Sequence, residues 1–398
     1  MLKIETRHNL VYPGMLILFI GLRRIIEILI ENLFESVGKY SLYTLIFISK
    51  FIAGLIAKNF SKFIIQPNSD SNGRNYSIMG IKLTKTNLEI SSIDSIPKII
   101  VLIFFASYFD IIGTIVRKNF NMNDKKNKSL DERLKGFQII SSALLCYYTI
   151  RTKIYRHNIF SLVIIFICLI IIIIIEILYS SEGILLNSIN IILTLFSSFG
   201  RAFLDTIEKY LFEFNYMNPF KVIMFEGLIN TIFIILIIIL FDRRVLNEDF
   251  ERFKNLNDKI YLIILLFLHF ILSGLKNIYR VATIKLYSPM TRALAEIFLD
   301  PIIIMYTLYR DSEIYDFNYC VFYVINIFCL IIMTFCSCVY NDFIVLYCCG
   351  LEHDTYGEII KRSLTIEIGN NLDESFDMIS DNESICSISS KKDNYIIK

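Results

Sequence analysis

Residues 160–175 read FSLVIIFICLIIIIII and include no charged side chain. Glu176 is the first charge that follows this run. Comparable apolar runs recur at residues 231–241, 261–272 and 321–339. A helix of about 20 mostly apolar residues is long enough to cross the hydrocarbon core of a bilayer. Repeated runs of this kind predict an all-α, polytopic membrane protein.

The composition of the whole chain agrees with a membrane protein. Hydrophobic residues make up 55% of the 398 residues, charged residues only 20%, and the mean hydropathy is +0.56. A soluble domain of this length needs less apolar surface. The net charge of +2 gives no electrostatic reason to expect a nucleic-acid partner. The nine cysteines follow neither a metal-binding pattern nor the pattern of a secreted disulfide framework, so we expect no metal and no cofactor.

We predict about ten transmembrane helices between an N-terminal tail at residues 1–12 and a C-terminal tail at residues 346–398. The acidic, Ser-rich composition of the second tail predicts disorder. Several of the expected helices begin at a proline, which the first helical turn tolerates, whereas Pro301 falls inside the ninth helix and predicts a kink or break. The expected helices lie at residues 13–33, 41–57, 97–116, 133–150, 160–178, 186–212, 220–241, 259–284, 289–309 and 319–340.

Ten helices divide into two units of five, residues 13–178 and 186–345. Because five is odd, two such units in tandem have opposite orientations in the membrane. A faint repeat supports this division, since a basic residue followed by a small one opens both the fourth helix, at Lys135-Gly136, and the ninth, at Arg292-Ala293. Inverted repeats are common in transporters and place the substrate site at the repeat interface. We therefore expect a ten-helix transporter domain of two inverted five-helix repeats, with both ends on one side. The basic loops favour the cytosolic side on balance.

Charged side chains at membrane depth are costly and mark functional or structural sites. Asp110 and Glu226 have no oppositely charged side chain at helical spacing on their own helices. A buried carboxylate needs a basic partner, a proton or contact with water. The cations available to them on other expected helices are Lys135, Lys276, Arg280 and Arg292.

Two helices carry ladders of charges spaced four residues apart, which places each ladder on one helix face. The ladders are Arg201–Asp205–Lys209, with Glu208 beside it, and Arg292–Glu296–Asp300. Opposite charges at this spacing can pair within one helix, and this is our interpretation of the first ladder. For the second ladder, pairing within the helix and a position facing a cavity both stay open, because Pro301 follows it.

For the intramembrane charges as a group, a substrate or ion pathway and structural ion pairs between helices both stay open. Lys and Arg recognise phosphate or carboxylate through charge-assisted hydrogen bonds, so a pathway that they line favours an anionic solute. The four histidines are scattered and no phosphate-binding loop is present, so we expect no enzymatic activity. The expected substrate-binding residues are Asp110, Lys135, Gln138, Glu226, Lys276, Asn277, Arg280, Arg292 and Glu296.

Four segments together resemble a known family. They are SYFDIIGTIV at 107–116, RLKGFQIISSALLCYYTIRTKIYRHN at 133–158, LDTIEKYLFEFNYMNPFKVIMFEGL at 204–228 and KNIYRVATIKLYSPMTRALAEIFLDPI at 276–302. In this order they resemble the drug/metabolite transporter superfamily, in particular its EamA-like and nucleotide-sugar-transporter-like members of the solute carrier family 35 group F type. The expected site residues on the matching segments are Asp110, Lys135, Gln138, Asn277, Arg280, Arg292 and Glu296.

The resemblance implies two inverted five-helix repeats, cytosolic termini and alternating access around a central cavity. It also implies an endomembrane location such as the Golgi, the endoplasmic reticulum or a vacuole-like compartment. The expected function is secondary-active transport of a small anionic solute, such as a nucleotide sugar or a related metabolite. The expected partners are this solute and the lipid bilayer, with a homodimer left open. The alternative is a non-transporting multipass adaptor or receptor, which predicts charges paired within or between helices and no central polar cavity.

Overall fold

The computed structural model describes most of the predicted helical domain. Asp110, the stretch 242–258 and, apart from Thr355, the expected tail beyond residue 346 lie outside the described residues. Within the described part the chain is helical except for four short strands and a few connecting turns, which confirms the predicted all-α class. The described residues are 2–4, 11–33, 39–63, 75–78, 81–84, 100–109, 111–112, 130–178, 184–215, 217–241, 259–311, 317–346 and 355.

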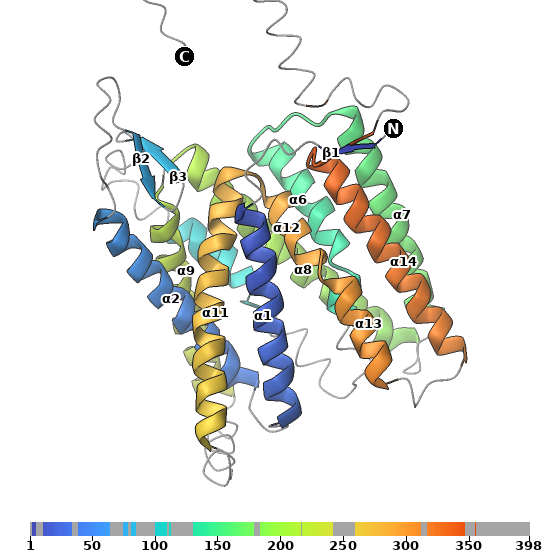
Figure 1. Cartoon of the computed structure of the whole chain (residues 1–398), viewed down its shortest axis with the longest axis horizontal. Coiled ribbons are helices and arrows are strands. Elements are labelled where there is room, and N and C mark those ends of the chain that lie inside the picture. The colour runs from blue at the N-terminus through green and yellow to red at the C-terminus, as the bar shows by residue number, and fades with distance from the viewer. Residues whose placement is uncertain are drawn as a thin grey trace, which may run out of the picture.

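Each of the predicted helical ranges overlaps a described helix (Figure 1). The strands form two small antiparallel pairs, β1 (Leu2–Ile4) with β4 (Ile344–Leu346) and β2 (Asn75–Ile78) with β3 (Ile81–Thr84). The helices are α1 (Val11–Leu33), α2 (Lys39–Phe63), the helix Ile100–Phe109, α5 (Leu130–Arg133), α6 (Gly136–Thr149), α7 (Arg156–Leu178), α8 (Ile184–Glu213), α9 (Pro219–Phe241), α11 (Lys259–Leu286), α12 (Pro289–Ile297), α13 (Asp300–Asp311) and α14 (Phe317–Tyr340).

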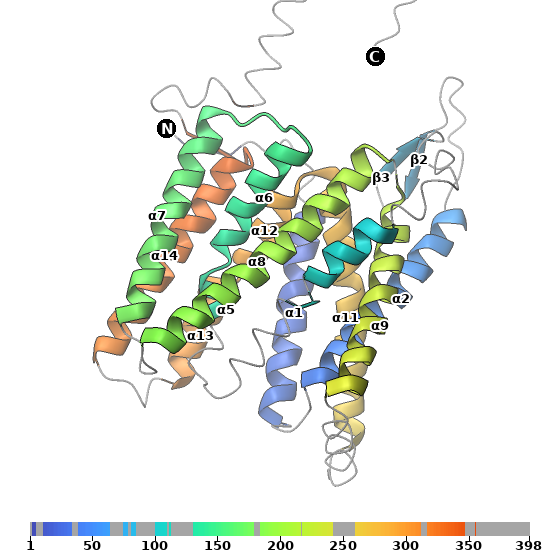
Figure 2. The ribbon, with the colours of Figure 1, turned by 180° about the vertical axis from the view of Figure 1, so that it is seen from behind.

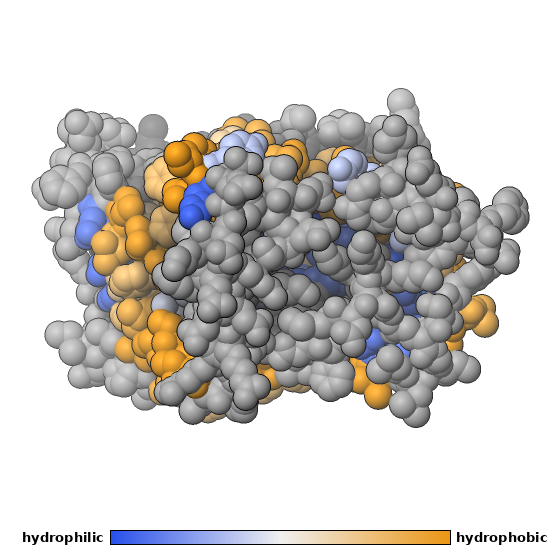
Figure 3. All heavy atoms as spheres, turned by 90° about the horizontal axis from the view of Figure 1, so that it is seen from below, coloured by the Kyte–Doolittle hydropathy of each residue, from blue (hydrophilic) through white to orange (hydrophobic). Residues whose placement is uncertain are grey.

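Five of the described helices are long and apolar enough to cross a bilayer. Their outward faces carry large apolar side chains, of which Phe166, Phe267 and Phe328 are 55%, 64% and 63% exposed. Figure 3 shows hydrophobic side chains along the margins of the molecule when it is seen from below. Apolar surface of this extent is unfavourable in water and normal in lipid, so these helices make the chain a multi-pass membrane protein. The candidate spans are Leu42–Asn59, Arg156–Leu178, Pro219–Ile237, Lys259–Leu286 and Val321–Tyr340.

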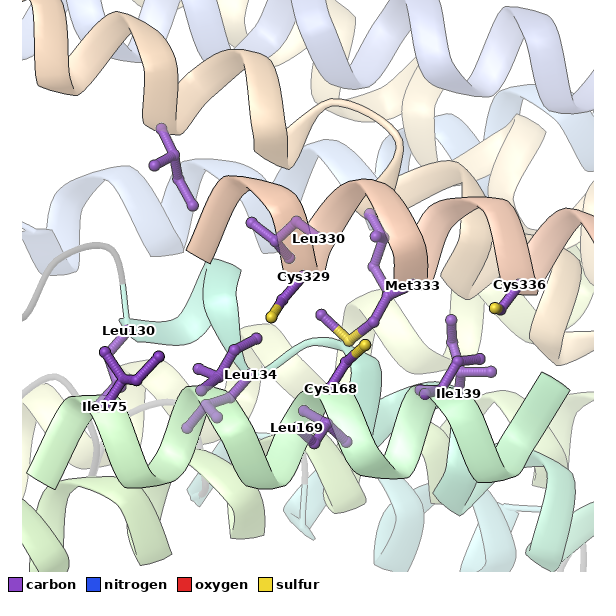
Figure 4. Close-up of a cluster of buried hydrophobic side chains, with 14 of the residues drawn as sticks. Leu130, Leu134, Ile139, Cys168, Leu169, Ile175, Cys329, Leu330, Met333 and Cys336 are labelled. Carbon is purple, nitrogen blue, oxygen red and sulfur yellow. The ribbon is translucent and has the colours of Figure 1, made fainter. Parts of the chain in front are cut away.

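The helices pack around two hydrophobic clusters, and the long helix α8 joins them (Figures 1 and 2). The first cluster lies among α1, α2, α9 and α11, and α8 contributes Leu204 and Leu211 to it. The second lies among α6, α7, α13 and α14, and α8 contributes Ile191. Figure 4 shows α7 facing α14 in the second cluster, with Cys168 directed toward Cys329 and Met333. Small and flexible side chains of this kind fill narrow gaps between helices.

Two glycines bring α2 and α9 into backbone contact. A Cβ atom on Gly54 of α2 would lie 2.6 Å from the backbone nitrogen of Met224, and one on Gly227 of α9 would lie 2.4 Å from that of Phe51. The contacts are reciprocal. Gly54 faces Met224, which lies three residues before Gly227, and Gly227 faces Phe51, which lies three residues before Gly54. Such reciprocity is typical of a crossing on a two-fold axis.

Two of the predicted helices are interrupted. The break expected from Pro301 is confirmed, since α12 ends at Ile297 and α13 begins at Asp300. Proline has no N–H, so it cannot donate a helical hydrogen bond to the carbonyl of Ile297 four residues earlier. The helix expected at residues 133–150 is present as α6, which begins three residues later than predicted. A turn at Leu134 and Lys135 separates α5 from α6.

The two ends of the helical domain meet. Strand β1 precedes α1, β4 follows α14, and they pair antiparallel with Leu2 opposite Leu346. The expected tail at residues 1–12 therefore includes a strand of the fold, and the expected boundary after residue 345 falls inside β4. Because the strands pair, the start of α1 and the end of α14 lie at the same end of the helices.

The side chain of Ser288 caps the first turn of α12. Its Oγ accepts a hydrogen bond from the backbone N–H of Thr291 at 3.1 Å. Replacing an N-cap serine by alanine removes this acceptor and costs about 1 kcal/mol. We expect Ser288→Ala to lower the melting temperature of the purified protein and Ser288→Asn to leave it nearly unchanged. Equal melting temperatures for the alanine variant and wild type would show that the cap contributes nothing.

Candidate functional site

Arg280 of α11 is the centre of a buried cluster of carboxylates. Its Nη1 donates to Asp205 Oδ1 at 3.2 Å, and its Nη2 donates to Glu208 Oε1 at 2.6 Å and to Glu226 Oε2 at 2.8 Å. The side chain of Arg280 is 5% exposed, and those of its partners are at most 1% exposed. Asp205 and Glu208 lie on α8 and Glu226 on α9, so one guanidinium ties three helices together.

Asp205 joins this cluster to a second arginine. While Oδ1 accepts from Arg280, Oδ2 accepts from Arg292 Nη1 of α12 at 2.8 Å and from Gln138 Nε2 of α6 at 3.2 Å. The carboxylate of Asp205 therefore lies between two guanidinium groups, each of which can bind an anion. Asp205 and both arginines lie in the second predicted half of the chain, and Gln138 is the contact from the first half.

The contacts continue in both directions. Glu226 Oε1 accepts from the ammonium of Lys50 on α2. At the other end, Glu296 Oε1 accepts from Arg292 Nη2 at 2.8 Å and lies 3.3 Å from Lys276 Nζ. We call this set the ion-pair chain, and its members are Lys50, Glu226, Arg280, Glu208, Asp205, Arg292, Glu296 and Lys276.

Lys135 and Asp300 form a further pair where the two interrupted helices meet. Lys135 lies in the turn between α5 and α6, and its Nζ donates to Asp300 Oδ1 at 2.7 Å. Asp300 begins α13, one helical turn after Glu296 of the ion-pair chain. Its side chain is 1% exposed, and its Oδ2 has no hydrogen-bond partner among the described residues.

The short helix α5 is held by charges that reach three other helices. Asp131 accepts from Arg201 of α8 at 3.4 Å, and Glu132 accepts from Arg24 of α1. On the third side, Arg133 donates to Glu176 of α7 at 2.8 Å.

The guanidinium of Arg133 also lies 5.1 Å from the ring centroid of Phe322 on α14, within cation–π range. The turn that carries Lys135 is thus fixed by ion pairs just before it in the sequence.

The ion-pair chain is formally neutral in the described structure. Its four cations match its four carboxylates, and Lys135 and Asp300 add one charge of each sign. Removing charges from water costs several kcal/mol per ion, which mutual pairing offsets only when the geometry is good. The most exposed side chains of this set are Lys135 at 14% and Lys276 at 16%. Lys276 contacts Glu296, and Lys135 contacts Asp300, which lies four residues further along the chain.

Most of the expected site residues come together in this arrangement. Among the nine, Asp110 lies outside the described residues. Asn277 is not part of the ion-pair chain, because its Nδ2 donates to the carbonyl of Ser273 within α11 at 2.9 Å. The expected residues that the structure brings together are Lys135, Gln138, Glu226, Lys276, Arg280, Arg292 and Glu296.

The predicted pairing within α8 is wrong for its first ladder. Arg201 reaches Asp131 on another helix, and Asp205 reaches two arginines on other helices. Lys209 pairs within α8, but with Glu213 at 3.1 Å and not with Asp205, whereas the second ladder shows the expected pair between Arg292 and Glu296. The spacing of charges along a helix does not reveal which neighbouring helix lies closer.

Sequence reasoning missed Lys50 and did not include Asp205, Glu208 or Asp300 among the site residues. A signal for Lys50 was present, because it is the one charged residue in the otherwise uncharged range 42–57. Within the described ranges no group of three or more His, Cys, Asp or Glu side chains could hold a metal ion.

The geometry defines a class, a helical membrane protein with a buried and balanced set of charges between its helices. No protein-family model matches the chain, and a search of curated proteins finds no match.

Proposed function

We propose that the chain is a secondary-active transporter that moves a small anionic solute across a membrane by alternating access, with no catalytic chemistry. The observation that carries this proposal is the buried position of Asp205 between Arg280 and Arg292, with Gln138 of the first half as a further donor. Two guanidinium groups that hold one carboxylate are equally suited to a phosphate or carboxylate of a solute. Asp205 would then occupy the anion site while the solute is absent.

The helix contacts support a two-repeat architecture. Pairing each helix with the one five positions later matches α1 with α8, α2 with α9, Ile100–Phe109 with α11, α6 with α12–α13 and α7 with α14. When each helix is exchanged for its counterpart, the contact of α6 with α8 becomes the contact of α12 with α1. In the same way, the contact of α6 with α7 becomes the contact of α13 with α14. The contact of α2 with α11 corresponds to that of Phe104 with Phe233 on α9, whose ring centroids are 5.0 Å apart.

Two further contacts fit the same symmetry. The pairs α2 with α9 and α7 with α14 map onto themselves, and the glycines at the first of these crossings are reciprocal. The pairing of β1 with β4 supports an even number of crossings between α1 and α14, because it brings the two ends of the helical domain together. These features support ten crossings in two inverted repeats of the drug/metabolite transporter type, with the interrupted fourth and ninth helices as counterparts.

The chemistry of the solute follows from the cations. Lys135, Lys276 and Arg292 surround Glu296 and Asp300, and two of these cations are partly exposed. A nucleotide sugar or a related phosphorylated metabolite offers the negative charge that such a group would bind. By the resemblance of the sequence, the proposed location is an endomembrane compartment.

Uptake into proteoliposomes tests the proposal. We expect the purified chain to take up at least one member of a panel of labelled nucleotide sugars, nucleotides and small anions. Replacing both Lys135 and Arg292 by alanine should lower uptake more than about tenfold, because two charge-assisted contacts are lost. Lys153→Ala is the matched control, since this lysine is exposed in the turn after α6 and should leave uptake unchanged.

Two outcomes would contradict the proposal in different ways. If the folded protein takes up no member of the panel, the transport function is wrong. If uptake persists undiminished in the double variant, transport stands but the assigned site is wrong. A melting curve for each variant separates loss of transport from loss of folding.

A non-transporting adaptor or receptor is the second candidate. The observation that favours it is the full pairing of the described ion-pair chain, which needs no solute for neutrality. In that case no anion in the panel is taken up and none raises the melting temperature. A transporter that binds its solute must be stabilised by it.

A further inference from the structure

Asp300 has the features of a binding site for a small cation. Its carboxylate is buried, one oxygen accepts from Lys135, and the other has no hydrogen-bond partner among the described residues. The break before Pro301 also leaves the Ile297 carbonyl without its usual helical donor. Interrupted helices in membrane proteins use such carbonyls and carboxylates to hold Na⁺ or a proton.

The charges around this pair are already matched elsewhere. The carboxylates whose charges act on Lys135 and Asp300 are Asp131 and Glu132 of α5 and Glu296 of α12. Each has its own cation, since Arg201, Arg24 and Arg292 respectively contact them, and Lys276 also reaches Glu296. Helix α14, which packs against α13, includes no charged residue. A cation that replaced Lys135 at Asp300 would therefore leave one positive charge unmatched.

We infer that Asp300 binds a monovalent cation, Na⁺ or a proton, in competition with the ammonium of Lys135. Binding releases Lys135. The net charge of the ion-pair chain, Lys135, Asp300 and the bound cation together is then +1, whereas it was zero before binding. The released charge lies beside Lys276 and Arg292, where it attracts the anionic solute. Cation and anion then bind cooperatively, which is the requirement for moving both in the same direction. The role in coupling rests on the proposed transport function, whereas the cation site itself does not.

Thermal unfolding of the purified full-length protein tests the site without any solute. A thiol-reactive dye reports unfolding, because Cys146, Cys168, Cys329 and Cys336 are buried in the folded state. Sodium chloride replaces choline chloride at constant ionic strength in one series, and pH is varied without sodium in the other. A cation that binds only the folded protein raises the melting temperature as its concentration rises.

Three variants give the expected pattern. Asp300→Asn removes the response to the cation. Lys135→Gln removes the competitor, so the protein melts lower in choline, and the stabilising response appears at concentrations at least about tenfold lower. Glu213→Gln is the control, because it neutralises a carboxylate at the end of α8 that pairs with Lys209, and it should keep the response of the wild type.

The two series identify the cation. Stabilisation by sodium at fixed pH assigns Na⁺. A proton is assigned if sodium has no effect and the wild type gains stability over Asp300→Asn as the pH falls.

The same responses to sodium and pH in Asp300→Asn and in the wild type would overturn the inference. Should Asp300→Asn fail to fold, an unchanged response in Lys135→Gln overturns it instead. Because the assay includes no solute, its failure leaves the proposed transport intact, and absence of uptake in proteoliposomes leaves the cation site intact.

Discussion

Arg280→Met is expected to lower the free energy of unfolding by about 3–5 kcal/mol, the range for breaking a buried ion pair by removing one partner. The substitution leaves Asp205, Glu208 and Glu226 buried with less compensating charge. Methionine keeps most of the side-chain volume, so the loss reports charge and not packing. The measurement is the fall in melting temperature, followed with the thiol-reactive dye.

Two further variants show whether unpaired charge is the cause. In the double variant Arg280→Met with Glu208→Met, one unpaired carboxylate is gone, so we expect part of the stability to return. Arg201→Met is the control, because Arg201 and its partner Asp131 are 18% and 20% exposed and partly exposed pairs contribute about 1 kcal/mol or less. A double variant that melts lower than Arg280→Met would contradict this explanation.

Gly227→Ala is expected to cost about 3 kcal/mol by forcing α2 and α9 apart. The added Cβ would lie 2.4 Å from the nitrogen and 2.7 Å from the Cα atom of Phe51, so the helices must separate by roughly 1 Å to reach normal contact. Overpacking of this kind typically costs about 1–3 kcal/mol. The ion pair of Lys50 with Glu226, next to this contact, is strained as well.

The comparison of three glycine variants tests this prediction. Gly54→Ala should have a similar effect, since its Cβ would lie 2.6 Å from Met224 nitrogen, and the two substitutions together should cost less than their sum. Gly14→Ala is the control, because nothing lies within 4 Å of its Cβ position, and alanine favours the helix by about 0.5–1 kcal/mol. Equal melting temperatures for Gly14→Ala and Gly227→Ala would rule out the close crossing.

The sequence predicts those features of the fold that depend on local composition. Apolar runs locate the helices, and Pro301 predicts the break in the ninth because a missing N–H acts on its own helix. No proline or glycine precedes the turn at Lys135 in α5, so the sequence carries no local signal for it. The turn depends on ion pairs of α5 with three other helices, which only the folded chain brings together.

The sequence predicted many of the site residues but few of the contacts between them. Glu226 was expected to need a cation from another helix, with Arg280 among four candidates, and the structure pairs the two at 2.8 Å. Asp205 was assigned to its own helix because its neighbours there have the right spacing. Its actual partners lie 75 and 87 positions away in the chain, and no local pattern encodes that separation.

The contact of α2 with α9 is a pivot about which the two helices can rotate; we call it the fulcrum. Because no side chain separates Gly54 or Gly227 from the backbone of the facing helix, the two helices can rotate about this contact but cannot slide along each other. A rocking of one half against the other would displace atoms in proportion to their distance from this point. The pair Lys50–Glu226 adjoins the fulcrum and would hardly move. Lys135 and Asp300 adjoin α6 and α13 of the other hydrophobic cluster, so the same small rotation would displace them further than Lys50 and Glu226.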